Sequence, residues 1–373
     1  MRITGILLAT CLGATACGGG GGSAPAPLPA NQAAATTAPA PASTPTAAPV
    51  SGNGFAPTSL PLKVSAIVPS TTVDRDDAHV VSLSVPSNLV VPPAQKGKVH
   101  FLPVQSGAGR PAAREKRPST FVNSPFDVSY FGGFVVGSTV SHNIYVSTNY
   151  RNCASTCWGI PGQFVADLGA SSFIGHLDQY IGSNTANRYT KGNSYAYTVG
   201  LAASNPGVNN PVISQDTLLL LVYYVSLTEG SGYGHIFHVF LHPGLDTCVD
   251  FTTQCYSPDN PQTFTFCAYH SSVNYGGGEL LYTVEPYADV RGCGVTGGAN
   301  TQNNDDLIDS TANNLSHEIF ETITDPNGDA WWNYQNGDEI GDPCRGYRYS
   351  PNLNGTLYTI QSEYSNIDHA CIN

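Results

Sequence analysis

The cysteines constrain the fold of this chain more than any other feature of its sequence. The chain has ten cysteines, and two of them, Cys11 and Cys17, lie within the first 17 residues. The remaining eight are even in number, which is typical of structural disulfides in an exported protein. Pairing nearest neighbours leaves none over, although eight cysteines allow about 105 connectivities. This pairing predicts the disulfides Cys153–Cys157, Cys248–Cys255, Cys267–Cys293 and Cys344–Cys371.

The N-terminus has the pattern of a signal peptide over residues 1–16. Arg2 supplies one positive charge, an apolar stretch follows, and small residues precede Cys17. The string Ala14-Thr15-Ala16-Cys17 resembles a bacterial lipobox, which implies that Cys17 is acylated and becomes the mature N-terminus. We therefore expect a lipoprotein of the cell envelope that faces the periplasm or the exterior. Ordinary secretion is the alternative, because the leucine that a lipobox usually has three residues before its cysteine is absent. No other run reaches the roughly 18 apolar residues of a membrane span, so the lipid is the only membrane contact that we expect.

Composition divides the rest of the chain into three parts. Residues 17–59 are dominated by Ala, Pro, Thr, Gly and Ser, which predicts a disordered tether after the lipidated cysteine. Residues 60–120 predict a small strand-rich segment and a linker, with a pro-segment and its processing site as the alternative. Residues 121–373 show a globular pattern and are numerous enough for one sizeable core. The net charge of −12 argues against nucleic acid as a partner, because phosphate binding needs a basic surface.

Hydrophobic periodicity predicts a mixed α/β domain. Runs rich in β-branched and aromatic residues predict strands at 135–146, 235–241, 263–269 and 280–284. Three- and four-residue spacing of apolar residues predicts helices at 161–181 and 303–324. The run 213–227 could be a buried strand or a helix, and Ser214 followed by Asp216 favours the helix. Strands that alternate with helices place the domain in the α/β class.

The helix expected at 303–324 carries the string Ser316-His317-Glu318-Ile319-Phe320-Glu321. His317 and Glu321 are four residues apart, so both side chains project from one helical face. In the H-E-x-x-H motif of zinc peptidases, two histidines bind the metal and the glutamate between them is the general base on metal-bound water. Here Glu321 replaces the second histidine, and carboxylate oxygens also bind zinc. The string predicts metal ligands at His317 and Glu321 and a catalytic base at Glu318. A solvated helix face with incidental acids is the alternative.

A second acidic string, Gly337-Asp338-Glu339-Ile340-Gly341-Asp342-Pro343-Cys344, follows this helix. Its spacing from the helix is similar to that in thermolysin-like enzymes, where a downstream glutamate completes the metal site and an aspartate beyond it orients a ligand. By this similarity we expect Glu339 on the metal and Asp342 on the other ring nitrogen of His317. The roles of Glu339 and Asp342 could be exchanged.

Histidines elsewhere in the domain are weaker candidates for the site. His235, His238 and His242 alternate with apolar residues in an expected strand, which favours a surface-facing edge. His270 follows a strand and an expected disulfide at Cys267 that would fix its position, so it is a further candidate. The sequence has no G-x-S-x-G elbow, P-loop or dinucleotide fingerprint.

Three parts of the chain carry a resemblance to one known family. They are Phe126–Val136, Phe266–Ser271, and the block from Ser316 through Pro326, Trp331-Trp332 and Glu339–Cys344. Together they resemble the phosphate-induced, EXORDIUM-like extracellular proteins over about residues 126–371. Plant members of that family are associated with the cell wall and with growth responses and have no settled catalytic activity. The resemblance implies an extracellular protein, and bacterial relatives with this pattern look like metallopeptidases.

These observations lead to one expected fold and one expected function. We expect a mixed α/β domain of zincin-like character, stapled by disulfides, after a disordered N-terminal tether. The expected function is zinc-dependent hydrolysis of a peptide or cell-wall substrate, with His317, Glu321 and Glu339 on the ion and Glu318 as base. The alternative is a non-catalytic extracellular EXORDIUM-like binding protein that contacts cell-wall polysaccharide or protein.

Overall fold

The computed structural model describes residues 67–69, 80–86, 89–105, 125–148, 157–182, 188–200, 211–250, 253–295 and 305–373. The chain divides into two compact units, residues 1–60 and 61–373, and all described residues belong to the second. The expected signal peptide, the tether, Cys17 and Cys153 lie outside the described residues.

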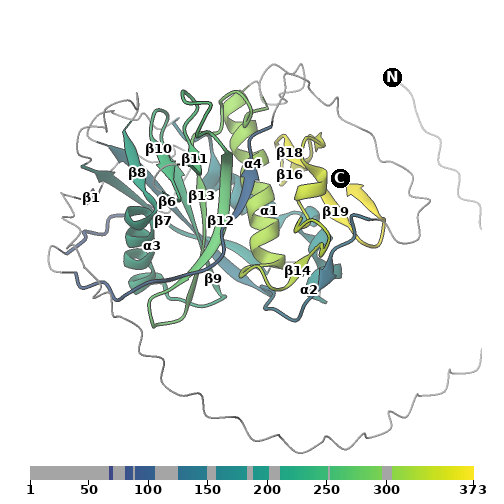
Figure 1. Ribbon diagram of the computed structural model, residues 1–373, viewed down its shortest axis with the longest axis horizontal. Coiled ribbons are helices and arrows are strands. Elements are labelled where there is room, and N and C mark those ends of the chain that lie inside the picture. Colours follow the sequence, from purple (N-terminus) through teal and green to yellow (C-terminus); the bar gives the residue numbers. More distant parts are fainter. Residues whose placement is uncertain are drawn as a thin grey trace, which may run out of the picture. The chain divides into compact units, whose positions relative to one another are not determined.

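A sheet of nine strands forms the centre of the described structure (Figure 1). Its strands are β1 (Ile67–Pro69), β2 (Val80–Val81), β3 (Gln95–Lys96), β4 (His100–Pro103), β6 (Thr139–Thr148), β7 (Tyr189–Val199), β9 (His235–Leu241), β12 (Phe266–Asn274) and β13 (Glu279–Glu285). The order is β1-β7-β6-β9-β13-β12-β3, with β2 paired to β7 and β4 paired to β12. The pairs β7–β6, β6–β9 and β9–β13 are parallel. Strand β12 runs antiparallel to β13, β3 and β4, and β1 runs antiparallel to β7.

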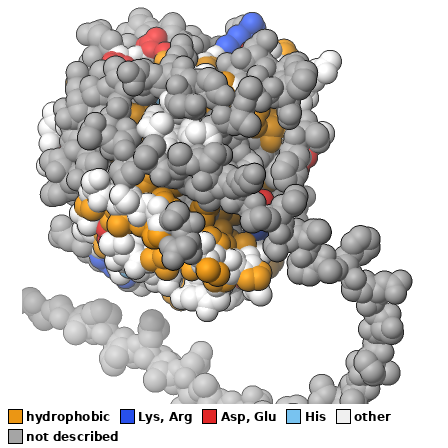
Figure 2. Space-filling view, turned by 90° about the vertical axis from the view of Figure 1, so that its left-hand side faces the viewer, with side chains coloured by type: hydrophobic (Ala, Val, Ile, Leu, Met, Phe, Trp, Pro, Cys, Tyr) orange, Lys and Arg blue, Asp and Glu red, His pale blue; other side chains and the backbone are white. Residues whose placement is uncertain are grey.

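Helices cover both faces of this sheet, as the parallel strands at its centre require. In Figure 1, α3 (Gln215–Glu229) lies on one side, and α1 (Pro161–Ala170) and α4 (Asp306–Thr324) lie on the other. Side chains that alternate along a strand enter different cores: Val239 packs in the core that contains α3, and Phe240 in the core that contains α4. Seen from the α3 side, the described surface has one area where apolar side chains gather (Figure 2). The expected mixed α/β class is confirmed.

Short elements complete the domain around this sheet. The helical ones are η1 (Ser172–Leu177), α2 (Asp178–Ile181) and η2 (Asp342–Cys344). The small sheets pair β8 (Val212–Ser214) and β11 (Cys255–Tyr256) with β10 (Asp246–Cys248), β5 (Ser129–Tyr130) with β14 (Trp331–Trp332), β15 (Arg348–Tyr349) with β18 (Ile360–Gln361), β16 (Asn352–Leu353) with β17 (Thr356–Leu357), and β19 (Glu363–Ser365) with β20 (Ala370–Ile372).

Helix α4 confirms the helix expected at 303–324 from residue 306 onward. The Asp305 side chain accepts hydrogen bonds from the backbone N–H groups of Leu307 and Ile308, both at 3.1 Å, which explains the start of the helix. Every residue from Ile308 to Thr324 is buried, so the polar face of α4 is not solvated.

The other expected elements are confirmed, with one interruption. The helix interpretation of 213–227 is right, because α3 follows Ser214, whose hydroxyl accepts the Thr217 N–H at 3.3 Å. The helix expected at 161–181 is broken after α1, where Ser171 has extended backbone and its hydroxyl donates to the Leu168 carbonyl at 2.8 Å. The expected strands are β6, β9, β12 and β13; β9 has the expected bounds, and the other three have shifted ends. None of the described helices is long and apolar enough to cross a membrane.

The boundary expected at residue 121 does not separate two structures. Strands β3 and β4 come from the 60–120 segment and pair with β12 of the central sheet. Leu102 on β4 is 4% exposed and packs beside Cys267 and Cys293. Such short strands cannot form a core of their own, so they are stable only as part of this sheet.

Three of the four expected disulfides are confirmed by their geometry. The sulfur atoms lie 1.96 Å apart in Cys248–Cys255, 1.99 Å in Cys267–Cys293 and 2.03 Å in Cys344–Cys371. Cys157 is also disulfide-bonded, and its expected partner Cys153 lies outside the described residues.

Candidate metal centre

The polar face of α4 carries three buried side chains that the sequence singled out. His317 and Glu318 have no exposed surface, and Glu321 retains 2%. Nε2 of His317 lies 3.0 Å from Oε2 of Glu321 one helical turn later. The structure therefore brings these two side chains together, as their spacing predicts.

Two histidines reach the same region from the sheet. His270 on β12 and His100 on β4 are cross-strand partners, and their stacked rings have centroids 5.1 Å apart. Nδ1 of His270 lies 3.1 Å from Oε2 of Glu318, so this face of β12 is turned to α4. His100 was not among the candidates predicted from the sequence. The one signal for it is its place at the start of a short β-prone run, which forms β4.

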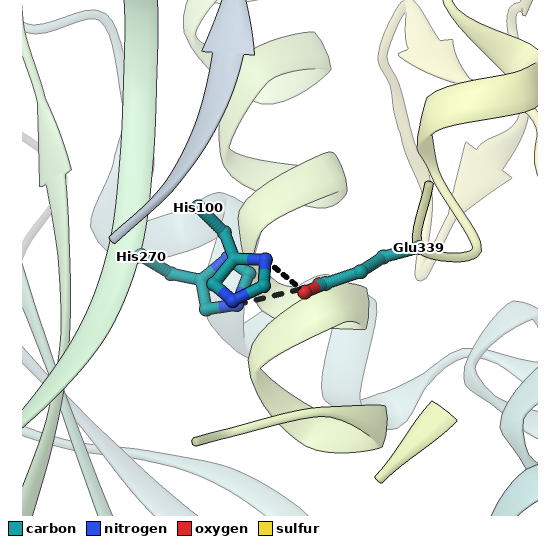
Figure 3. Close-up of side chains that lie close together, drawn as sticks. All are labelled: His100, His270 and Glu339. Carbon is teal, nitrogen blue, oxygen red and sulfur yellow. Dashed lines mark ion pairs between the residues drawn. The ribbon is translucent and has the colours of Figure 1, made fainter. Parts of the chain in front are cut away.

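Glu339 approaches the two histidines from the segment that precedes η2. Figure 3 shows its carboxylate pointing at both rings. One oxygen contacts Nδ1 of His100, and the other lies 3.4 Å from Nε2 of His270. A side chain from the C-terminal part of the chain thus meets two from neighbouring strands.

Backbone N–H groups shape this segment and hold it against α4. The Glu339 N–H donates to Oδ2 of Asp342 at 2.9 Å, and the Gly341 N–H donates to Oε1 of Glu321 at 3.2 Å. A Cβ atom at Gly341 would lie 2.4 Å from Nδ1 of His317. Glycine at this position therefore allows the close approach that places Glu339 and Asp342.

These seven side chains form three groups whose potential ligand atoms lie within 4.8 Å of one another. The groups are His100, His270 and Glu339; His270, Glu318 and Glu321; and His317, Glu321 and Asp342. The expected set of His317, Glu321 and Glu339 differs from these groups. Glu339 lies with the histidines of the sheet, and Asp342 takes the place beside His317.

The spacing within the groups fits a bound metal ion. Ligand atoms about 2.1 Å from a tetrahedral ion lie about 3.4 Å from one another. The 3.0 Å between His317 and Glu321 and the 3.4 Å between His270 and Glu339 are close to this value. Nε2 of His270, Nε2 of His317 and Oε1 of Glu318 are buried without a hydrogen-bond partner among the described residues. Since buried polar atoms nearly always have a partner, lone pairs grouped in this way suit a cation.

The carboxyl groups of the cluster are strongly perturbed by burial. Burial, reinforced by neighbouring carboxylates, raises the pKa of Glu318 and of Glu339 well above the usual range. Burial also raises the pKa of Glu321 to about 8 and that of Asp342 to about 7. Four acids confined in this volume repel one another when ionised, and a divalent cation would remove that penalty.

Burial keeps the three histidines of the cluster neutral. It lowers the pKa of His100 to about 3 and that of His317 to about 4, and it lowers the pKa of His270 well below its usual value. Neutral imidazole is the form that coordinates a metal.

The cluster is sealed in its middle and nearer to solvent at its ends. The side chains of His270 and Glu318 are completely buried. The His100 side chain keeps 10% of its surface exposed, and that of Asp342 keeps 17%. Any ligand would therefore enter at one of these two ends.

Gln361 occupies the position in which Asp342 was expected. Its Nε2 lies 2.9 Å from Nδ1 of His317 and donates to the Gly341 carbonyl at 2.9 Å. This contact leaves Nε2 of His317 as the ring nitrogen that faces the cluster. The amide N–H donates to Nδ1, so a metal ion on Nε2 would require Gln361 to turn its amide oxygen to Nδ1 and accept from it. The role expected for Asp342 on the ring thus belongs to Gln361, which was not predicted from the sequence.

The surface-facing interpretation of His235, His238 and His242 is wrong for His238 and His242, whereas His235 is half-buried. Strand β9 lies between β6 and β13 in the middle of the sheet. His238 has no exposed surface and His242 retains 1%. His238 bonds to Thr283 through Nδ1 at 3.0 Å, so it is held within the sheet.

Comparison of this chain with protein-family models, with curated proteins and with solved structures gave no match.

Proposed function

We propose that this protein is a metal-dependent hydrolase whose buried centre binds a divalent ion, with zinc as the expected metal. The observation that carries the proposal is the group in Figure 3, in which His100 on β4, His270 on β12 and Glu339 on the segment before η2 converge. Two neutral imidazoles and one carboxylate form a donor set that is typical of catalytic zinc.

Glu318 is suited to two tasks beside this ion. Its Oε2 lies 3.1 Å from Nδ1 of His270, which would fix the ring with Nε2 toward the ion. Its Oε1 has no partner among the described residues and is free to accept a proton from water. A divalent ion in this place would polarise the scissile carbonyl and favour ionisation of water near neutral pH.

The zincin-like character and the EXORDIUM-like membership remain part of this proposal. The string His317 to Glu321 on a buried helix, followed by Glu339 on a downstream segment, supports a zincin-like arrangement. The two histidines that the sheet contributes depart from the set expected from the sequence. The substrate class that we propose is a peptide or a cell-wall polymer.

Hydrolysis of a quenched fluorescent peptide library and of purified cell-wall material tests this function. We expect turnover that a chelator abolishes and zinc restores. If the protein contains zinc but hydrolyses neither substrate class, the metal centre is supported and the hydrolase function is contradicted.

A second candidate is a non-catalytic extracellular binding protein, and one surface favours it. Five aromatic side chains are between 48% and 66% exposed: Phe126, Tyr130, Phe131, Phe134 and Tyr334. Phe131 stacks on Trp332 with centroids 4.3 Å apart, and Phe134 stacks on Tyr233 at 3.7 Å. Exposed aromatic rings are typical of binding surfaces.

Cosedimentation with insoluble cell-wall polysaccharide tests this second candidate. The double variant Phe131→Ala, Phe134→Ala should release the protein, whereas Leu227→Ala, at an exposed aliphatic position, should not. Equal sedimentation of both variants and the wild type would count against this surface.

We also propose that the chain is a lipoprotein of the cell envelope, on the basis of its leader. Cys17→Ala should abolish acyl labelling and recovery in the membrane fraction. Unchanged labelling would exclude lipidation at this residue.

A further inference from the structure

We infer that the buried cluster binds two metal ions, one at each end. This inference rests on the metal centre proposed above and extends it. The groups His100, His270, Glu339 and His317, Glu321, Asp342 have no residue in common, and each supplies three ligand atoms within 4.8 Å of one another. Three protein ligands are what a catalytic ion ordinarily has.

The nitrogens of the histidines point at different parts of the cluster. Nε2 of His270 faces Glu339 at 3.4 Å, whereas its Nδ1 lies 3.1 Å from Glu318 and 3.8 Å from Glu321. His317 belongs to the other end, where Nε2 lies 3.0 Å from Glu321 and Gln361 holds Nδ1. One ion cannot be reached by both His100 and His317 in this arrangement, because they share no group.

The acidic side chains of the cluster are also divided between its two ends. Glu339 belongs to the first group, and Glu321 and Asp342 belong to the second. The two groups are adjacent, because Glu321 of the second group lies 3.8 Å from Nδ1 of His270, which belongs to the first. Two-metal hydrolytic sites hold their ions roughly 3.5–4 Å apart.

Metal stoichiometry of the full mature chain tests this inference. Protein stripped with a chelator, reloaded with zinc and freed of excess by gel filtration is analysed for zinc per chain. We expect two equivalents in the wild type, one in His100→Ala, one in His317→Ala and none in the double variant. His142→Ala is the matched control, because His142 is a histidine with 1% exposure outside the cluster, and it should keep two equivalents.

A titration of the stripped wild type with Co²⁺ gives the same information without any substitution. We expect the visible absorption to rise until two equivalents are bound, even if a histidine variant fails to fold. Saturation at one equivalent, with both single variants empty, would overturn the two-ion inference and leave the proposed metal-dependent function intact. No bound metal in the wild type would overturn both.

Discussion

His100 and His270 face each other across β4 and β12, and their stacked rings both present a nitrogen to the Glu339 carboxylate. The pair joins β4, which comes early in the described chain, to β12 near one edge of the sheet. It also gives the proposed metal centre a wall that belongs to the sheet.

Substitution His100→Ala should weaken metal binding while the fold is retained. One of three ligands disappears, and we expect a loss in zinc affinity of at least about tenfold. Competition with a chromophoric chelator measures this affinity. His142→Ala, which also empties a buried position, should lower the melting temperature and leave zinc affinity unchanged. Equal zinc affinity in the wild type and in His100→Ala would show that His100 is not a metal ligand.

Substitution Glu318→Gln should lower turnover by about 10²–10⁴-fold, the usual contribution of general acid–base catalysis. Gln keeps the volume of Glu but cannot accept the proton. Steady-state hydrolysis, with zinc content measured on the same sample, separates loss of catalysis from loss of metal. The control is Glu279→Gln on β13, which lies outside the cluster and should keep full turnover. Full activity in Glu318→Gln would assign the base to another residue.

The disulfides should contribute to stability in the order of the loops that they close. Cys344–Cys371 spans 27 residues and Cys248–Cys255 spans 7. Loop-closure entropy predicts losses of about 3.6 and about 2.4 kcal/mol when each pair is replaced by serine. Urea unfolding of the two double variants measures both. Free-thiol titration of the unfolded, unreduced wild type should find none, and several reactive thiols per chain would contradict the pairing.

The sequence predicted the parts of the centre that depend on local spacing. His317 and Glu321 share a face because they are four residues apart, and the periodicity of α4 was readable. His100 was not predictable in this way, because its position depends on pairing between β4 and β12, which are distant in sequence. The same limitation explains why His238 was wrongly expected at the surface. Alternation within β9 does not show that this strand lies between β6 and β13.

Ionisation of the buried Glu285 carboxyl group should lower the free energy of unfolding as the pH rises. Burial raises its pKa from 4.5 to about 8 on β13, so the folded protein holds this proton more tightly than the unfolded chain does. The free energy of unfolding should therefore decrease between about pH 4.5 and pH 8 by on the order of a few kcal/mol. Urea unfolding of the wild type and Glu285→Gln at pH 5, 7 and 8.5, both with chelator, measures the difference. If the free energy of unfolding changes with pH equally in both proteins, Glu285 does not titrate in this way.

The effect of a chelator on the melting temperature tests the metal centre most directly. A ligand that binds only the folded state at 100 times its dissociation constant adds about 2.7 kcal/mol to the free energy of unfolding. We therefore predict that the wild type melts several degrees lower after chelation and that stoichiometric zinc restores the original value. A melting temperature that neither chelator nor zinc changes, in protein that carries no metal, would contradict the metal centre.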